Sequence, residues 1–457
     1  MTPAPDTTIA SGLSRRRLLF GAGFVAAVAA LGTPEAEAAE RTASAAANGR
    51  APHADPPVDG LHLQFGADAG TEMVVSWHTR TPVQRARVLL GDTHGRFERT
   101  VGATTRSYVD EQSGTRVYTH HAHLTRLRAR AGYLYAAVHE GAAPQFGEFR
   151  TGPHGRARVT FTSFGDQGTP TVGKQASQGG KATWVNDNLG SLAAGDTTGG
   201  VELVAPMFHL FNGDLCYANL STDRVRTWWD FWANSTRSAR NRPWMPSPGD
   251  HENELGNGTI GYAAYQAYFS VPPSAGQTAL TRGLWYSFKI GGVRVISIAN
   301  GDICDRDGGG SDERGYSKGA QHAWLEAQLR AARADHGIDW IVVCMHQVAI
   351  SAASDFNGAD LEERQEWMPL LDRYAVDLVI GGGTSAPAYG FAAFEVDPGR
   401  PGHDTIMSVT YYNVTEVGGG LEVADTFTLR RPRSDTRSRP DSPTGAERGG
   451  MPCGLTR

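Results

Sequence analysis

The chain has 457 residues, which is enough for two or three domains. Apolar residues make up 40% of it and charged residues 20%, so a packed core can form and wholesale disorder is excluded. Its 43 basic and 48 acidic residues leave a net charge of −5. This balance excludes a broadly basic protein, and we expect no nucleic acid among its partners.

The first 38 residues have the features of an export signal. Residues 14–19 contain a twin-arginine pattern, an apolar run follows at 20–31, and residues 36–38 offer a small-residue cleavage site. The apolar run is too short to span a bilayer core of about 30 Å, so it predicts no stable membrane anchor. We therefore interpret residues 1–38 as a twin-arginine signal peptide, the export machinery as a transient partner and the mature protein as secreted.

The next segment combines a linker with an all-β region. Residues 39–54 are rich in Ala, Thr and Ser, which is typical of a linker. Between 55 and 152, short runs such as 73–77 alternate apolar and polar residues, with glycine-containing turns between them. The pattern predicts a small sandwich with Trp77 in its core.

From residue 156 to about 430 the pattern changes, and apolar runs of the buried type alternate with helical stretches. The predicted strands are 159–164, 207–211, 293–298, 340–344 and 376–380. The predicted helices are 184–192, 222–234, 320–335 and 360–374. This alternation predicts an α/β domain with layered sheets, in which active sites gather beyond the strand ends. Residues 431–457 lack periodicity, and we predict a disordered tail there.

Polar side chains follow three of these predicted strands, and a fourth set follows the loop at 245–248. The residues concerned are Asp166, Asp214, Tyr217, Asp250, His251 and His346. Carboxylates, a phenol and imidazoles that meet on one rim can hold two metal ions about 3.5–4 Å apart, with one aspartate bridging them. Four such loops in order, three of them directly after a strand, predict a dinuclear metal centre.

In these loops the chain resembles the purple acid phosphatases of the metallophosphoesterase superfamily. That family reads GDxG, GDxxY, GNH[DE] and VxxH in order, and the matching residues here are 165–168, 213–217, 249–252 and 343–346. The resemblance covers roughly residues 55–430. It implies an all-β fibronectin type III-like or Ig-like sandwich at 55–152, followed by an α/β metallophosphoesterase domain at 156–430.

The resemblance also implies a ligand set for two metal ions. Asp166 and Tyr217 would bind Fe(III), with Tyr217 as a phenolate. Asp214 would bridge to a second, divalent ion, which is iron, zinc or manganese. Asp250 and His346 would serve that second ion.

On the substrate side, the resemblance implies that His251 contacts the phosphate and protonates the leaving oxygen, as a general acid. Asp250 shares this side, and there the chain departs from the family, which has an asparagine at this position. An aspartate keeps the metal-binding oxygen but loses the amide donor and adds a negative charge. We therefore expect tighter metal binding and weaker phosphate binding.

A larger departure follows the predicted strand at 376–380. The family has a GHxH motif there, with one histidine for each metal, but this chain reads Gly381-Gly382-Gly383-Thr384-Ser385. We interpret the difference as an internal deletion near residues 380–383 that joined two similar strand ends. Because metal ligands are lost, metal affinity should fall by at least the 10–100-fold that loss of supporting residues costs.

Three functions remain open at this point. The first is a secreted acid phosphatase that cleaves small phosphate monoesters with a dinuclear metal centre. The second is an impaired or inactive scaffold that keeps the fold without a competent site. The third is a related exported phosphodiesterase, although that group has a cysteine near its first aspartate and this chain has none at residues 163–165.

Overall fold

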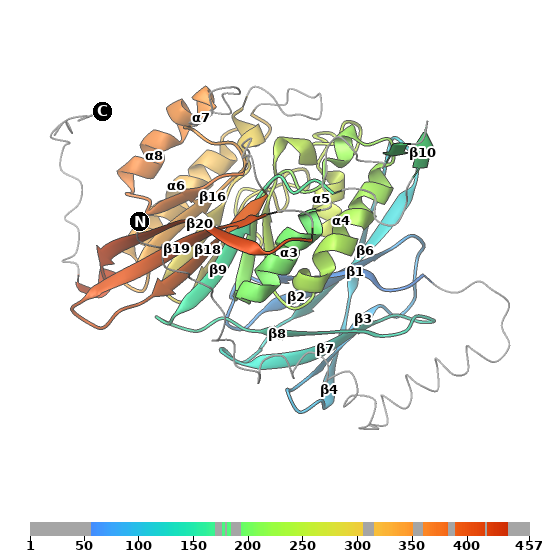
Figure 1. The fold of residues 1–457 in the computed structure, drawn as a ribbon, viewed down its shortest axis with the longest axis horizontal. Coiled ribbons are helices and arrows are strands. Elements are labelled where there is room, and N and C mark those ends of the chain that lie inside the picture. Colours follow the sequence, from blue (N-terminus) through green and yellow to red (C-terminus); the bar gives the residue numbers. More distant parts are fainter. Residues whose placement is uncertain are drawn as a thin grey trace, which may run out of the picture.

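The computed structural model describes residues 56–169, 176–178, 181–183, 193–304, 315–350, 360–382, 389–415 and 418–436. The predicted signal peptide, the predicted linker and the predicted helix at 184–192 lie outside these residues. A β-sandwich is followed by an α/β domain with layered sheets, which confirms the predicted fold class (Figure 1). In the part of the chain that the structure describes, no helix is long and apolar enough to cross a membrane.

The sandwich consists of two four-stranded antiparallel sheets. The first has the order β1 (Asp59–Phe65), β2 (Met73–Thr79), β6 (Arg116–Leu124) and β5 (Thr104–Val109). The second has the order β4 (Phe97–Gly102), β3 (Arg87–Gly91), β7 (Gly132–Val138) and β8 (Gln145–Arg150). Trp77 of β2 is fully buried between them, as the alternation at 73–77 predicts.

The α/β domain has a six-stranded and a four-stranded sheet. The six-stranded order is β13 (Trp244–Ser247), β12 (Phe208–Asn212), β9 (Val159–Phe164), β18 (Gly390–Asp397), β19 (Asp404–Val414) and β20 (Leu421–Pro432). The four-stranded order is β14 (Tyr286–Ile290), β15 (Val293–Ser297), β16 (Trp340–Cys344) and β17 (Leu378–Ile380). A separate hairpin joins β10 (Ala176–Gln178) and β11 (Lys181–Thr183). Because β13, β12 and β9 are parallel, and β15, β16 and β17 are too, their carboxyl ends share one edge of each sheet.

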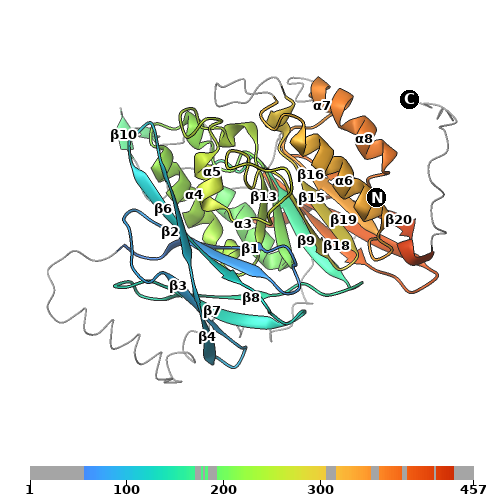
Figure 2. The ribbon, with the colours of Figure 1, turned by 180° about the vertical axis from the view of Figure 1, so that it is seen from behind.

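Helices cover the outer faces of both sheets, apart from α5 (Ala263–Tyr268), which packs on β2, β5 and β6 of the sandwich (Figures 1 and 2). The others are α3 (Ala193–Val204), α4 (Arg224–Ala239), α6 (Ala320–Ala334), α7 (Leu361–Glu366) and α8 (Met368–Arg373), with 3-10 turns η1 (Ala218–Leu220), η2 (Asp250–Glu252), η3 (Asn300–Asp302) and η4 (Ser434–Thr436). Helix α4 begins where the Asp223 carboxylate accepts a hydrogen bond from the Arg226 N–H. It buries Val225, Trp228 and Trp232, which lie on one face at helical spacing.

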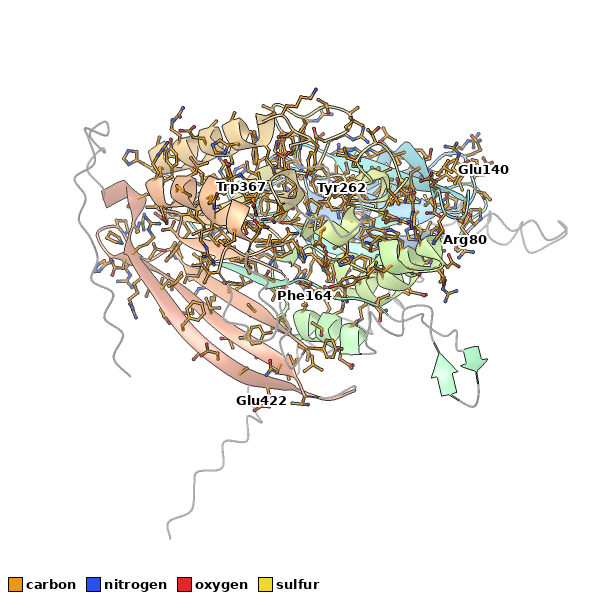
Figure 3. All side chains as sticks on the ribbon, turned by 90° about the horizontal axis from the view of Figure 1, so that it is seen from above. Arg80, Glu140, Phe164, Tyr262, Trp367 and Glu422 are labelled. Carbon is orange, nitrogen blue, oxygen red and sulfur yellow. The ribbon has the colours of Figure 1, made fainter. Side chains whose placement is uncertain are left out.

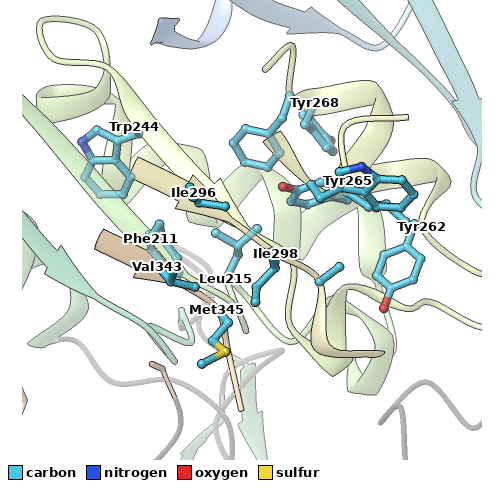
Figure 4. Packing of buried hydrophobic residues seen from close by; sticks show 14 of the residues in the cluster. Phe211, Leu215, Trp244, Tyr262, Tyr265, Tyr268, Ile296, Ile298, Val343 and Met345 are labelled. Carbon is cyan, nitrogen blue, oxygen red and sulfur yellow. The ribbon is translucent and has the colours of Figure 1, made fainter. Parts of the chain in front are cut away.

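Two apolar cores hold these layers together. One core lies between the two sheets and continues into the sandwich, because Phe161 and Val342 belong to the same buried cluster as Trp77. The other lies under the helices, and Figure 4 shows Leu215, Val343 and Met345 close together within it. Leu215 directly follows Asp214 and Met345 directly precedes His346, so this core fixes the backbone beside two candidate ligands.

The outer face of the β1–β2–β6 sheet is polar but buried against the α/β domain. His62 and His121 each place a ring nitrogen against a backbone carbonyl at the end of α5, at 3.0 Å from Tyr268 and 2.9 Å from Ala267. His78 packs on Trp229 and Tyr268. All three imidazoles are fully buried, so the contact between the domains is lined by histidines rather than by a purely apolar surface.

Two predicted elements differ from the structure, and one helix that packs on β18 has no predicted counterpart. The run at 376–380 forms only the short β17, whose Val379 is 37% exposed because the four-stranded sheet ends there. The predicted tail begins too early, since β20 continues to Pro432 and η4 follows. Helix α3 was not predicted: its glycines weaken a helix, but Gly200 lets it approach β18, where a Cβ would lie 2.6 Å from Phe391.

Candidate active site

The four loops at the strand ends meet at one edge of the two sheets, as the sequence predicts. Two groups of donor atoms form there, each with all its atoms within 4.8 Å of one another. Asp166, Asp214 and His346 make the first group, and Asp214, Asp250 and His251 make the second. Because Asp214 belongs to both, it lies where a bridging ligand must lie. Carboxylate and imidazole donors suit iron, zinc and manganese, so the residues fit a metal centre of the predicted kind.

The backbone is strained at the residues that present these groups. Asp166, Asp214 and Tyr217 have φ angles of 52°, 51° and 57°, in the left-handed region that non-glycine residues rarely adopt. Such strain costs on the order of 1–3 kcal/mol per residue and gathers at functional sites. Gly213 also has a positive φ of 76°, and a Cβ there would lie 2.6 Å from the His346 side chain. The loops therefore direct the polar side chains into the site at the cost of backbone strain.

His346 lies between two carboxylates. Its Nε2 is 3.1 Å from Oδ2 of Asp214 and 3.1 Å from Oδ1 of Asp250, while its Nδ1 is 2.9 Å from the carbonyl of Asn212. Burial disfavours the charged imidazole, but the carboxylates outweigh it and raise the pKa of His346 well above its ordinary value. In the same way, burial of Asp250 is outweighed by its hydrogen bond with His346, so the pKa of Asp250 is lowered. The imidazole of His346 thus lies against two carboxylates whose negative charge a bound cation would also neutralise.

Tyr217 and His251 line the other side of the site. The Tyr217 hydroxyl donates to Oδ1 of Asp166 at 2.9 Å, and its ring packs 4.5 Å from that of His251. Burial and the charges of Asp214 and Asp166 raise the pKa of Tyr217 well above its ordinary value. His251 places Nδ1 3.0 Å from Oδ1 of Asn219, whereas its Nε2 is 3.8 Å from Asp214. Because the amide oxygen only accepts, Nδ1 of His251 carries the proton in this hydrogen bond.

Glu252 ties the two central loops together. Its buried carboxylate accepts backbone hydrogen bonds from Gly249 at 2.7 Å, Asp214 at 2.8 Å and Leu215 at 2.8 Å. Burial and the nearby charge of Asp214 raise the pKa of Glu252 to about 8. The side chain holds Asp214 in register with the loop that carries Asp250 and His251.

Asn300 and Glu363 support His346 from behind. Oδ1 of Asn300 accepts the backbone N–H of His346 at 2.8 Å, and its amide donates to Glu363 at 2.5 Å. Both side chains are buried. Together they fix the backbone at the end of β16, which aims the imidazole into the site.

Sequence reasoning missed several of these supporting residues. Asn219 was given no role by the sequence, and Glu252 appeared there only as part of the motif at 249–252. Gln347, whose amide donates to Asp250 at 3.2 Å, was passed over beside His346. Their positions in the sequence could have indicated them, because each lies within two residues of a predicted site residue.

The end of β17 supplies no ligand among the described residues. Gly381 and Gly382 pack so closely that a Cβ on the first would overlap Val348, and one on the second would overlap the Asn212 carbonyl. A Cβ at Gly382 would also lie 2.7 Å from Nδ1 of His346. At the strand end where the family carries its GHxH motif, the backbone of Gly381 and Gly382 therefore packs directly against the site. The residues from 383 to 388 lie outside the described part of the chain.

Comparisons with known proteins match both domains of the chain. The model of the purple acid phosphatase N-terminal domain matches residues 58–151, and that of the calcineurin-like phosphoesterases matches residues 201–387. An uncharacterized protein of Mycobacterium tuberculosis is 48% identical over 470 aligned positions, which cover 83% of this chain and 88% of that protein. Purple acid phosphatase 18 of Arabidopsis thaliana is 25% identical over 327 residues, covering 70% of this chain and 64% of that protein. The structure of purple acid phosphatase PPD1 from yellow lupin (Lupinus luteus) seeds has the same fold, with a TM-score of 0.63 at 17% identity over 83% of this chain and 75% of that chain.

The mycobacterial alignment also bears on the length of the chain. Its 470 positions cover 83% of 457 residues, which is about 379, so about 90 positions hold no residue of this chain. The extra length of the relative lies inside the aligned region. The matching domains, the relative and the shared fold lead to one conclusion: the chain belongs to the purple acid phosphatase family of metallophosphoesterases.

Proposed function

We propose that the protein is a secreted, metal-dependent phosphatase that cleaves phosphate monoesters. The observation that supports this best is the pair of donor groups that share Asp214. A shared carboxylate at the meeting point of four strand ends is the arrangement that a dinuclear centre requires. Export rests on the twin-arginine pattern at residues 14–19, which the sequence alone provides.

The metal centre would be held by residues of both groups. Asp166, Tyr217 and Asp214 would take Fe(III), and Asp214, Asp250 and His346 would take a divalent ion of iron, zinc or manganese. Two bound cations would neutralise phosphate charge and lower the pKa of a water molecule at the site. The residues that hold Asp214 and His346 in place keep this donor set pre-formed, which limits the reorganisation that binding requires.

His251 would supply the proton for the leaving oxygen. Its Nδ1 is engaged with Asn219, so Nε2 is the atom that can hold and release a proton towards substrate. Its side chain is 19% exposed, whereas that of His346 is 5% exposed, so His251 is the imidazole that a substrate can reach. Packing of its ring against Tyr217 limits rotation and keeps Nε2 directed at the site.

The test is hydrolysis of p-nitrophenyl phosphate and of bis(p-nitrophenyl) phosphate by purified full chain with added iron, zinc or manganese. We expect metal-dependent release of p-nitrophenol from the monoester, and little from the bis ester. His251→Ala should abolish that activity without loss of bound metal. Preference for the bis ester would instead support a phosphodiesterase.

A second candidate is an impaired scaffold without a competent centre. Two observations favour it: the glycine backbone at Gly381 and Gly382, and the aligned positions that have no residue in this chain. Metal analysis of the purified protein separates the two candidates. Two equivalents of tightly held metal would support the enzyme, whereas absence of both metal and turnover under every condition would support the scaffold.

A further inference from the structure

The β5–β6 connection of the sandwich, residues 110–115 and named the sandwich turn below, contacts the two segments that flank His251. Glu111 donates its backbone N–H to Oδ1 of Asn257 at 2.9 Å. Gln112 donates its side-chain amide to the carbonyl of Ser221 at 3.3 Å. Asn257 lies in the loop 253–258 that follows η2, and Ser221 directly follows η1. The sandwich therefore contacts both segments within a few residues of the candidate site.

A buried charge pair strengthens this contact. Oδ1 of Asp110 lies 3.7 Å from Nη1 of Arg224, and the two side chains are 0% and 10% exposed. That Asp110 oxygen has no hydrogen bond, so the guanidinium is its charge partner. The same Nη1 donates to the carbonyl of Leu255 at 3.0 Å. Arg224 thus joins the sandwich turn, the start of α4 and the loop 253–258, and removing one member would leave a buried charge unpaired.

The loop 253–258 also fits the sandwich turn closely in shape. Gly256 has a φ of +83°, and a Cβ there would overlap the carboxylate of Glu111. Within the loop, Glu254 accepts hydrogen bonds from the indole of Trp228 at 2.7 Å and the amide of Asn257 at 2.8 Å. The loop is therefore fixed on one side by α4 and on the other by the sandwich.

One held segment hydrogen-bonds to His251, and the other continues the turn that carries it. Asn219 of η1 accepts from its Nδ1, and Asn253 donates its N–H to the carbonyl of Asp250, which continues η2 into the loop. We propose that the sandwich turn is a positioning element of the active site, which orients His251 by holding η1 and the loop 253–258. What His251 does in catalysis rests on the proposed function, but the contacts that orient it do not.

The test uses the full chain labelled with 15N at histidine, in variants made on either side of the contact. Gln112→Ala deletes the bond to Ser221, and Asn257→Ala deletes both the acceptor of the Glu111 N–H and the hydrogen bond to Glu254. Arg116→Ala is the matched control, because this exposed side chain of the same hairpin donates to Ser107 on the neighbouring strand. The ring signals of His251 are identified by their loss in His251→Ala, and each variant is checked for an unchanged thermal midpoint.

We expect Gln112→Ala and Asn257→Ala to shift or broaden the His251 signals, and Arg116→Ala to leave them in place. Turnover of p-nitrophenyl phosphate should fall by up to about 10²-fold in kcat in the two variants, since small misplacements of a reacting group carry such costs. Unchanged His251 signals in both variants would overturn the proposal. If the wild-type chain shows no turnover, the proposed function fails, and the spectra alone decide on the positioning role.

Discussion

At the scale of single residues, Asp250 lies where several neighbours compete for its carboxylate. Oδ1 is 3.1 Å from His346 and 3.2 Å from the amide of Gln347, while Oδ2 faces His251 at 3.9 Å. Replacement by asparagine keeps an oxygen for metal but removes a negative charge beside an anionic substrate. The exchange therefore tests whether the departure from the family weakens phosphate binding.

We predict that Asp250→Asn raises kcat/KM for p-nitrophenyl phosphate by roughly fivefold, the effect of about 1 kcal/mol between charges about 4 Å apart in water. It should also weaken metal binding, which titration of the divalent ion would measure. Asp425→Asn on the exposed face of β20 serves as the control and should change neither value. Unchanged or lower turnover in Asp250→Asn would refute the prediction.

Glu252 gives a second prediction at this scale. A glutamine in its place retains one accepting oxygen, and its NH2 group would face backbone N–H groups that need an acceptor. We expect Glu252→Gln to lower the free energy of unfolding by about 1–3 kcal/mol, the cost of leaving buried donors unpaired. Urea unfolding measures this, with the exposed Glu98→Gln as the control. Equal midpoints for the two variants would show that Glu252 does not hold these loops.

At the scale of elements, the strands that lead into the site were predictable because each combines an apolar run with a polar end. Strands β9, β12 and β16 and the loops with Asp166, Asp214 and His346 follow from that pattern alone. The exposure of β17 was not predictable, because an apolar run does not show whether the strand lies inside a sheet or at its edge. β20 has exposed residues on both faces, including Phe427 at 47%, and therefore lacks the alternation of a half-buried strand. Figure 3 shows Glu422 of this strand at the rim of the molecule.

The end of β17 gives a prediction at this scale. We expect Gly382→Ala to destabilise the protein by about 1–3 kcal/mol or more, because the new methyl group would overlap the Asn212 carbonyl and must displace backbone. Gly420→Ala is the matched control, since a Cβ there meets nothing within 4 Å, and it should stay within about 0.5 kcal/mol of wild type. Differential scanning calorimetry compares the two. A Gly382→Ala midpoint equal to that of Gly420→Ala would contradict the described packing.

At the scale of the whole molecule, the polar contact between the domains makes stability depend on pH. Burial lowers the pKa of His62 to about 4 and that of His78 and His121 well below the ordinary value. Unfolding exposes these rings and returns them to about 6.5, so the unfolded chain binds more protons than the folded one below that pH. Their contribution to stability is complete above about pH 6.5 and declines as the pH falls towards 4.

We therefore predict that the free energy of unfolding falls by about 1.4 kcal/mol per pH unit for each of these histidines, within the window between its two pKa values. Urea unfolding at several pH values between 7.5 and 5 measures the slope. In His78→Leu the slope of the unfolding free energy against pH should fall by the contribution of one proton. Leucine suits this test because the ring nitrogens of His78 have no hydrogen-bond partner that the substitution would remove. A slope equal to that of the wild type would exclude His78 as a source of the dependence.

The close packing of Gly381 and Gly382 also limits how the site can be rebuilt. A histidine placed at Gly381 by substitution would push against Val348, and one at Gly382 would push against the carbonyl of Asn212. An inserted segment after β17 would let the chain leave the sheet and return with side chains at a workable distance. At this strand end, a new metal-binding side chain is therefore a question of added chain length before it is one of residue identity.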